Sequence, residues 1–350
     1  MNAVIGWDVG GANIKAALVE RVDHVDPKAI ERPFALWREP QRLTDVLVET
    51  AAHLGPTSHM AVTMTAELAD CFATKREGVH FVLASLRRAF PDVTLWIYGL
   101  DGSFHSVEAA RERPYHVAAA NWLASTTVAA RTFADAVFID VGSTTTDIIP
   151  IVRGRVVSQG RCDVARLRSG ELVYTGALRT PICAILRSVP LCGGRHRVAA
   201  EHFAIAADAH VWLGRIDEHE YTCETPDGRG RSRLEAAARI ARMVCADRET
   251  LKSDDITAIA ESVARAQVQQ IAVGIRQVLR RVGVDRPHEA ILVGCGRFLA
   301  RAAARRLGLN THELTKQSAA CATPACAVAF LLLERERHGI PSHHRADTEV

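Results

Sequence analysis

Two short turns of the chain combine glycines with an aspartate and could bind a phosphorylated group. One runs Asp8-Val9-Gly10-Gly11-Ala12-Asn13, and the other runs Asp140-Val141-Gly142-Ser143-Thr144-Thr145. A glycine turn that follows a strand directs backbone N–H groups toward one point, and such a nest binds phosphate oxygens. The carboxylate beside each nest suits Mg²⁺, either directly or through its water ligands. These residues therefore predict Mg²⁺-assisted binding of phosphate or diphosphate.

The two turns share the sequence Asp-x-Gly, and they also share the spacing from this aspartate to a later charged residue. Asp8 precedes Lys15 by seven positions, and Asp140 precedes Asp147 by the same number. An ordinary tight hairpin explains either turn alone, but the repeated Asp-x-Gly core favours a strand–turn–strand unit that is used twice. The predicted phosphate-binding residues are Gly10, Gly11, Asn13, Lys15, Gly142, Ser143, Thr144 and Thr145. The predicted metal ligands are Asp8, Asp140 and Asp147.

A third glycine turn, Gly294-Cys295-Gly296, follows a strand predicted over His288–Val293 and leads into a helix predicted over Phe298–Leu307. A phosphate or a nucleotide could lie against the N-terminus of such a helix. A plain strand-to-helix connection explains these glycines equally well. Their position after the two aspartate turns is what favours a nucleotide-like turn at Gly294 and Gly296.

These turns need strands on either side to position them, and the hydrophobic pattern of the sequence predicts such strands. Apolar strands alternate with amphipathic helices along the chain, which predicts an α/β fold. The strands predicted around the two aspartate turns are Val4–Val9, Ile14–Val19, Ala136–Asp140 and Asp147–Val152. The longer predicted helices are Gln41–Leu54, Thr74–Phe90, Val117–Arg131, Ala200–Leu213, Ser232–Cys245 and Asp254–Val282.

Length and composition predict two globular lobes. The chain has 350 residues, of which 48% are apolar and 24% charged, and this length exceeds that of one typical domain. We expect lobe I over residues 1–132, with the first turn and a returning C-terminal helix at 318–336. Lobe II then covers residues 133–317, with the second turn and the Gly294-Cys295-Gly296 turn, and residues 337–350 form a polar tail.

Several classes of protein are disfavoured by composition. A net charge of +3 is small for this length and argues against a dedicated nucleic-acid binder. The nine cysteines contain no Cys-x-x-Cys pair, so neither a disulfide framework nor a zinc ribbon is indicated. No signal peptide is visible, and the longest apolar run, Ala319–Leu333, is too short to span a membrane. We expect a cytoplasmic protein that acts on small molecules, and its oligomeric state stays open.

The three turns, in their order along the chain, resemble the phosphate-1, phosphate-2 and adenosine motifs of the actin, sugar-kinase and Hsp70 superfamily. The resemblance implies a two-lobed actin-like ATPase fold, which is ribonuclease H-like. More narrowly, Asp140–Asp147 is similar to the hydantoinase/oxoprolinase branch. The segment Arg168–Pro181, called the signature segment below, resembles proteins linked to the tetrahydromethanopterin-dependent one-carbon transfer pathway, a group that includes a methanofuran-biosynthesis synthase.

This resemblance implies a transferase. In the synthase reaction, the phenol oxygen of a (γ-glutamyl)tyramine displaces diphosphate from the methyl carbon of an aminomethylfuran. Mg²⁺, Lys15 and the two turns would stabilise the negative charge of the departing diphosphate. A carboxylate would act as general base for the phenol, and Asp140 and Glu171 are both candidates. The implied catalytic residues are Asp8, Asp140 and Glu171, and the implied substrate-binding residues are Arg168, Tyr174 and Arg179.

Two other functions compete with this one. An ATP-dependent kinase or a hydantoinase-like amidohydrolase would use the same phosphate turns, and a non-catalytic nucleotide-binding regulator would use them without turnover. The turn Gly294-Cys295-Gly296-Arg297 lacks the Gly-Gly-x-Ala/Ser pattern that is common in nucleotide users. This difference favours diphosphate over ATP, and ATP as a cofactor stays open.

Overall fold

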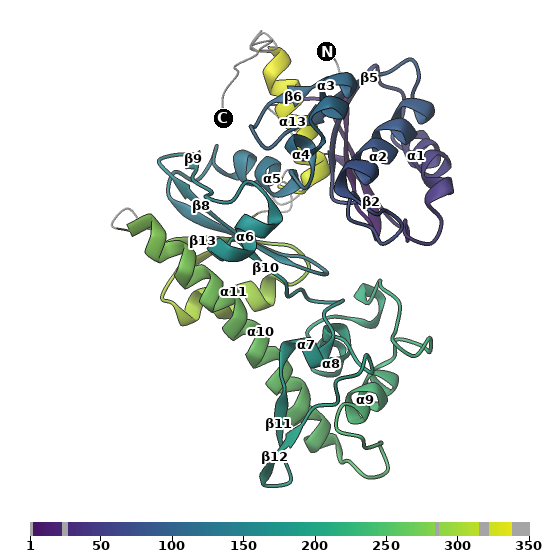
Figure 1. The fold of residues 1–350 in the computed structure, drawn as a ribbon. Helices are drawn as coiled ribbons and strands as arrows, with labels where there is room; N and C mark the ends of the chain where they lie inside the picture. Colours follow the sequence, from purple (N-terminus) through teal and green to yellow (C-terminus); the bar gives the residue numbers. More distant parts are fainter. Residues whose placement is uncertain (1–2, 23–26, 284–286, 315–321, 338–350) are drawn as a thin grey trace. The chain divides into compact units, whose positions relative to one another are not determined.

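The computed structural model describes residues 3–22, 27–283, 287–314 and 322–337. The chain divides into two compact units, of which unit 1 comprises Met1–Thr132 with Thr315–Val350 and unit 2 comprises Phe133–Leu314. Each unit contains a mixed β-sheet with helices packed on it (Figure 1). Among the residues described, no helix has both the length and the apolar character needed to cross a membrane.

Unit 1 is built on a six-stranded sheet with the order β3-β2-β1-β4-β5-β6. Its central strand β1 pairs antiparallel with β2 and parallel with β4. The strands are Val4–Val9 (β1), Asn13–Val19 (β2), Lys28–Pro33 (β3), His59–Met64 (β4), Thr94–Tyr98 (β5) and Phe104–His105 (β6). The helices are Pro40–Arg42 (η1), Leu43–Ala52 (α1), Lys75–Ala89 (α2), Val107–Glu112 (α3), Pro114–Val117 (α4), Asn121–Ala129 (α5) and Pro324–Arg337 (α13).

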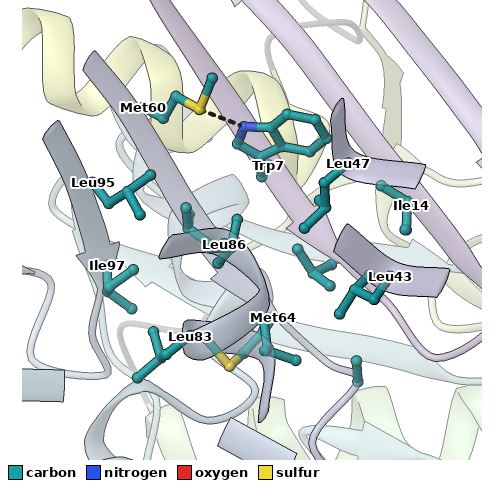
Figure 2. Packing of buried hydrophobic residues seen from close by; sticks show 14 of the residues in the cluster. Trp7, Ile14, Leu43, Leu47, Met60, Met64, Leu83, Leu86, Leu95 and Ile97 are labelled. Atoms are coloured by element: carbon teal, nitrogen blue, oxygen red, sulfur yellow. Dashed lines mark hydrogen bonds between the residues drawn. The ribbon is translucent and has the colours of Figure 1, made fainter. Parts of the chain in front are cut away.

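Strand β1 is buried on both faces, which places its aspartate in the interior. Ile5, Trp7 and Val9 pack in one core with residues of α1 and α2, and Figure 2 shows Trp7 among these side chains. The Trp7 indole N–H donates to the Met60 sulfur at 3.3 Å. Because side chains alternate along a strand, Asp8 lies on the face opposite to Trp7.

Helix α13 covers that opposite face of β1. A Cβ atom added to Gly6 would come within van der Waals overlap of the Ala325 carbonyl oxygen and 2.9 Å from the Ala329 Cβ. Only a glycine lets the helix backbone approach the strand this closely. The last described helix of the chain thus completes the core beneath the first strand, within unit 1.

Unit 2 contains a second sheet with the order β10-β8-β7-β13-β14, in which β9 also pairs with β8, and a separate β11-β12 hairpin. The strands are Ala136–Val141 (β7), Thr146–Val152 (β8), Arg155–Val156 (β9), Leu172–Val173 (β10), Ser188–Leu191 (β11), Gly194–Arg197 (β12), Glu289–Val293 (β13) and Asn310–Glu313 (β14). The helices are Asp163–Ser169 (α6), Ile182–Ile185 (α7), Ala206–Trp212 (α8), Glu218–Glu220 (η2), Arg233–Arg242 (α9), Ser253–Val282 (α10) and Arg297–Arg306 (α11).

The 30-residue helix α10 belongs to two cores of unit 2. Its N-terminal half, including Ile256 and Val263, packs in a core with α8 and β11. Its C-terminal half, including Ile271 and Val278, packs in another core with β7, β8 and α11. Figure 1 shows α10 running from the sheet to α8 and β11.

The duplication predicted from the two aspartate turns is confirmed in the strand registers. Asp8 lies opposite Lys15 in the β1–β2 pair, and Asp140 lies opposite Asp147 in the β7–β8 pair. In both units the first strand of the hairpin also pairs parallel with a later strand, β4 in unit 1 and β13 in unit 2.

Some predicted boundaries differ from the structure. The returning helix begins at Pro324 rather than 318, in keeping with the preference for proline in the first turn of a helix, and residues 318–321 lie outside the described part. The helix predicted over Ala200–Leu213 is confined to Ala206–Trp212. No side chain of strands β3, β12 and β14 is buried, and for that reason their sequences lack the apolar pattern of a strand. Residues 315–317 and 338–350 also lie outside the described part.

We expect Gly6→Ala to lower the Tm by about 5 °C or more, because the added methyl group would push α13 away from β1 at a cost of at least about 2 kcal/mol. Gly194→Ala is the control, since a Cβ there would meet no atom closer than 3.8 Å. Thermal unfolding followed by circular dichroism measures both variants. An unchanged Tm for Gly6→Ala would contradict the close packing of α13.

Candidate functional site

The first phosphate turn, residues 10–13, is held by its carbonyl groups. The Gly10 amide donates to the Asn13 carbonyl at 3.0 Å and closes the turn. The Gly11 carbonyl accepts from the Leu36 amide at 3.0 Å, and the Ala12 carbonyl accepts from the Phe34 amide at 3.0 Å. The chain that follows β3 therefore anchors this turn from one side.

The amides of the first turn are available to a ligand. Within the described part of the chain, the backbone N–H groups of Gly11 and Ala12 donate no hydrogen bond to the protein. Both residues are half-buried, so a ligand can reach them. Two neighbouring amides with this exposure form a nest that suits an anionic oxygen.

Asp8 and Lys15 flank the first turn. Asp8 is 6% exposed, and this burial raises its pKa above the usual range while the charge of Lys15 opposes the rise. The Asp8 Oδ1 atom is buried and has no hydrogen-bond partner among the described residues. Lys15 Nζ lies 3.9 Å from Glu31 Oε1, and the lysine side chain is 37% exposed. The turn thus has a buried acceptor and an accessible cation beside it.

The second phosphate turn, residues 142–145, repeats this arrangement. The Gly142 amide donates to the Thr145 carbonyl at 2.9 Å. The Gly142 carbonyl accepts from the Ala177 amide at 2.9 Å, and the Ser143 carbonyl accepts from the amides of Leu178 and Arg179 at 3.1 and 2.8 Å. The amides of the signature segment therefore anchor this turn by binding the carbonyl groups of the turn.

The amides of the second turn are likewise unused by the protein. In residues 3–22, 27–283, 287–314 and 322–337, no hydrogen bond involves the backbone N–H groups of Ser143 and Thr144. The side chains of Ser143 and Thr144 are half-buried, and their hydroxyl groups lie 3.5 Å apart. This turn can offer both amide and hydroxyl donors to phosphate oxygens.

The two aspartates of the second unit have different surroundings. Asp147 lies directly across from Asp140, and Arg166 from α6 binds Asp147 Oδ1 at 2.5 Å. Arg166 is 2% exposed and was not among the predicted site residues, because an arginine among 43 basic residues carries no signal of its own. This ion pair neutralises Asp147, whereas Asp140 is half-buried at the turn.

Glu171 lies in a closed hydrogen-bond network. Its carboxylate accepts from the amides of Gln159 and Gly160 at 2.7 and 2.8 Å, and from the Ser158 and Ser169 hydroxyls at 3.0 Å each. Arg281 of α10 binds it at 2.6 Å. Burial by itself raises the pKa of Glu171, but these hydrogen bonds and the charge of Arg281 outweigh it, and the pKa lies below its usual range. The network stabilises a carboxylate that is 0% exposed.

The three predicted substrate-binding residues lie at different places along the signature segment. Arg168 is exposed at the end of α6, and its carbonyl accepts from Gln277 of α10 at 2.6 Å. Tyr174 is 68% exposed after β10. Arg179 is half-buried, and its amide binds the second turn at Ser143. Of the three, the structure brings Arg179 next to a phosphate turn.

The glycines of the Gly294-Cys295-Gly296 turn are explained by packing. A Cβ on Gly294 would overlap the Val141 carbonyl oxygen and Asp140 Oδ1. The Gly296 amide donates to the Val141 carbonyl at 2.8 Å. Arg297, the first residue of α11, is exposed. The turn therefore lies directly against the end of β7, beside the second phosphate turn.

A magnesium ion would need ligands from these residues. Among the residues that the structure describes, no group of three or more His, Cys, Asp or Glu side chains could hold a metal ion. Mg²⁺ in phosphate sites is usually bound through one or two carboxylates together with substrate phosphates and water. The buried, unpartnered Asp8 Oδ1 fits this smaller requirement.

Two curated relatives carry the name (4-{4-[2-(gamma-L-glutamylamino)ethyl]phenoxymethyl}furan-2-yl)methanamine synthase. The protein from Methanocaldococcus jannaschii is 32% identical over 335 residues, which is 94% of this chain and 97% of that protein. The protein from Methanococcus vannielii is 30% identical over 203 residues, which is 56% of this chain and 90% of that protein. Both are enzymes by name, and the present chain is an enzyme.

Among solved structures, nucleotide-free acetone carboxylase is similar with a TM-score of 0.58 at 9% identity, covering 93% of this chain and 70% of that one. This likeness concerns the fold alone and confirms the predicted α/β actin-like class. Residues 59–335 match the hydantoinase/oxoprolinase family model, a span that includes the second phosphate turn, the signature segment and the Gly294-Cys295-Gly296 turn. The chain belongs to the hydantoinase/oxoprolinase family.

Proposed function

We propose that this enzyme is a Mg²⁺-dependent transferase that joins an aminomethylfuran methyl diphosphate to the phenol of γ-glutamyltyramine and releases diphosphate. The step would belong to the synthesis of a methanofuran-type cofactor for tetrahydromethanopterin-linked one-carbon metabolism. The name of the two relatives contains a phenoxymethylfuran unit, and the ether bond of that unit is the bond that this reaction forms.

The proposal rests mainly on the backbone hydrogen bonding of the two phosphate turns. Each turn has its carbonyls bonded to a neighbouring segment, and the amides of Gly11, Ala12, Ser143 and Thr144 donate no hydrogen bond within the described residues. Diphosphate oxygens accept hydrogen bonds and carry negative charge, so they complement such amides. A turn that served only to reverse the chain would have no need of this one-sided anchoring.

The reaction places its main electrostatic demand on the leaving group. The phenol oxygen forms a bond to the furanylmethyl carbon, the bond from that carbon to the diphosphate oxygen breaks, and diphosphate departs with the electron pair. The furan ring stabilises positive charge on the carbon. Lys15 and the amides of the turns would stabilise the charge that develops on diphosphate. Mg²⁺, held by Asp8 together with diphosphate oxygens, would neutralise more of it when bound.

The general base for the phenol is the second requirement, because a phenol has an ordinary pKa of about 10. Glu171 is fully engaged by its hydrogen bonds and by Arg281. Asp147 is paired with Arg166. Asp140 is half-buried at the edge of the second turn, so we assign the phenolic proton to Asp140.

The direct test supplies purified enzyme with the aminomethylfuran methyl diphosphate, a tyramine acceptor and Mg²⁺, and measures inorganic diphosphate. We expect release that requires the acceptor and stops when a chelator removes Mg²⁺. Calorimetric titration at one salt concentration should show tighter binding of Mg²⁺-diphosphate than of Mg²⁺-ATP.

The same experiments decide against the proposal if ATP is the true ligand. Tighter binding of ATP together with steady formation of ADP would identify a kinase or an ATP-dependent amidohydrolase. Tight binding of ATP without turnover of either substrate would identify a nucleotide-binding regulator.

We expect Lys15→Ala to weaken binding of Mg²⁺-diphosphate by about tenfold or more, because a charged donor is lost beside the turn. The Tm should change by less than about 2 °C, since an exposed ion pair such as that of Lys15 with Glu31 contributes little to stability. Lys28→Ala, on the exposed strand β3, is the matched control and should leave both quantities unchanged. Normal turnover in Lys15→Ala would remove this lysine from the mechanism.

Asp140→Asn and Glu171→Gln should fail in different ways. We expect Asp140→Asn to lower kcat by about 100-fold or more at nearly unchanged Tm, because the general base is lost. Glu171→Gln should lower stability by about 3 kcal/mol, because it leaves Arg281 without its carboxylate partner in a buried network. Its kcat, measured below the unfolding transition, should stay within a few-fold of wild type. A kcat loss in Glu171→Gln at normal Tm would make Glu171 the base.

A further inference from the structure

Gln267 lies on α10 between the residues that this helix contributes to two different cores of unit 2. Along α10 it falls between Val263, which packs with α8 and β11, and Ile271, which packs with β7 and β8. Its side chain is 0% exposed. A buried side-chain amide needs partners for both its nitrogen and its oxygen, so those partners indicate what the residue does.

The partners of Gln267 determine its orientation. The amide nitrogen Nε2 donates to the Gly176 carbonyl at 2.8 Å and to Thr175 Oγ1 at 3.0 Å. Oε1 lies 2.8 Å from His210 Nε2. A carbonyl can only accept, so the amide nitrogen must face Gly176, and Oε1 must then accept from His210. His210 therefore carries its proton on Nε2, and burial lowers the pKa of its ring to about 4, which keeps it neutral.

The backbone that Gln267 holds is in direct contact with the second phosphate turn. A Cβ on Gly176 would lie 2.5 Å from the backbone of Thr144, so no side chain fits between the two segments. The residue that follows, Ala177, donates its amide to the Gly142 carbonyl at 2.9 Å. Thr146 in turn donates its hydroxyl to the Thr175 carbonyl at 2.7 Å. A shift of Thr175 and Gly176 would therefore move the turn.

We propose that Gln267 is a positioning residue for the second phosphate turn. Through Thr175 and Gly176 it holds the Ser143 and Thr144 amides in the geometry that binds diphosphate, and His210 of α8 fixes the Gln267 side chain. This role rests on the proposed function of the turn as a diphosphate-binding element. Gln267 acts through the backbone of its neighbours and touches no reacting group.

The test compares Gln267→Leu with Gln270→Leu. Gln270 lies three positions further along α10 and donates to the Ile185 carbonyl at 3.2 Å, so it makes the same kind of bond to a segment remote from the turn. We expect Gln267→Leu to raise the Kd for Mg²⁺-diphosphate and the KM for the diphosphate substrate by about tenfold, with the KM for the acceptor changed less than twofold. Hydrogen exchange of the 142–146 amides should be faster in Gln267→Leu and unchanged in Gln270→Leu.

A milder variant covers the case in which Gln267→Leu does not fold. Thr175→Val keeps the side-chain shape and removes one acceptor of Gln267, so it should raise the same Kd by a smaller factor. If both substitutions act through one bond, the double variant should show less than the product of the two single effects. The positioning role would be overturned if Gln267→Leu raised the KM values of the two substrates equally. It would also be overturned if the Tm fell without any change in the Kd for Mg²⁺-diphosphate.

The proposal can fail separately from the proposed function. If wild-type enzyme releases diphosphate and Gln267→Leu binds it normally with unchanged hydrogen exchange, only the role of Gln267 is refuted. If wild-type enzyme neither binds nor releases diphosphate, the function is refuted. Hydrogen exchange of the 142–146 segment then still shows whether Gln267 restrains the turn, since that measurement needs no ligand.

Discussion

The binding of phosphate that we propose would depend on two tight turns being held by their carbonyl groups. A turn can present its amides to a ligand only when its carbonyls are satisfied elsewhere, because an unpaired buried carbonyl is costly. In unit 1 the amides of Phe34 and Leu36 supply those bonds, and in unit 2 the amides of Ala177–Arg179 supply them. The two anchors come from unrelated parts of the chain. The duplication thus extends to the hairpins and their parallel neighbours, and each unit anchors its turn independently.

The two hairpins share a register but differ in the charge of the residue that lies opposite the aspartate. Asp8 faces a lysine across the strand pair, so a cation stands beside the first turn. Asp140 faces Asp147, and two adjacent carboxylates would repel each other. Arg166 removes the repulsion by binding Asp147. The first turn therefore lies beside an aspartate–lysine pair, and the second lies beside two aspartates of which Asp147 is bound by an arginine.

Helix α10 holds the signature segment along one face. Gln267, Gln277 and Arg281 bind Gly176, Arg168 and Glu171 respectively. Gln277 precedes Arg281 by four residues and Gln267 precedes it by fourteen, and both separations are close to whole numbers of helical turns, so these side chains lie on one side of the helix. Gly274 lies within this face, where a Cβ would come 3.2 Å from the Gly170 carbonyl oxygen. The close approach that glycine permits brings the polar side chains within bonding distance. The signature segment is therefore bound to α10 through the backbone carbonyls of Arg168 and Gly176 and through the side chain of Glu171.

The sequence by itself determined the local features: both phosphate turns, their aspartates, the strands around them and the α/β class. The turns follow from contacts between residues near one another in the chain, such as Gly142 with Thr145. The strands follow from the periodic apolar pattern of the sequence. Only the tertiary structure decided which carboxylates are engaged and what holds each turn. Glu171 meets Arg281, and Thr175 meets Gln267, across separations of 110 and 92 residues. No spacing in a sequence encodes such a pairing, because the fold of the intervening chain brings the partners together.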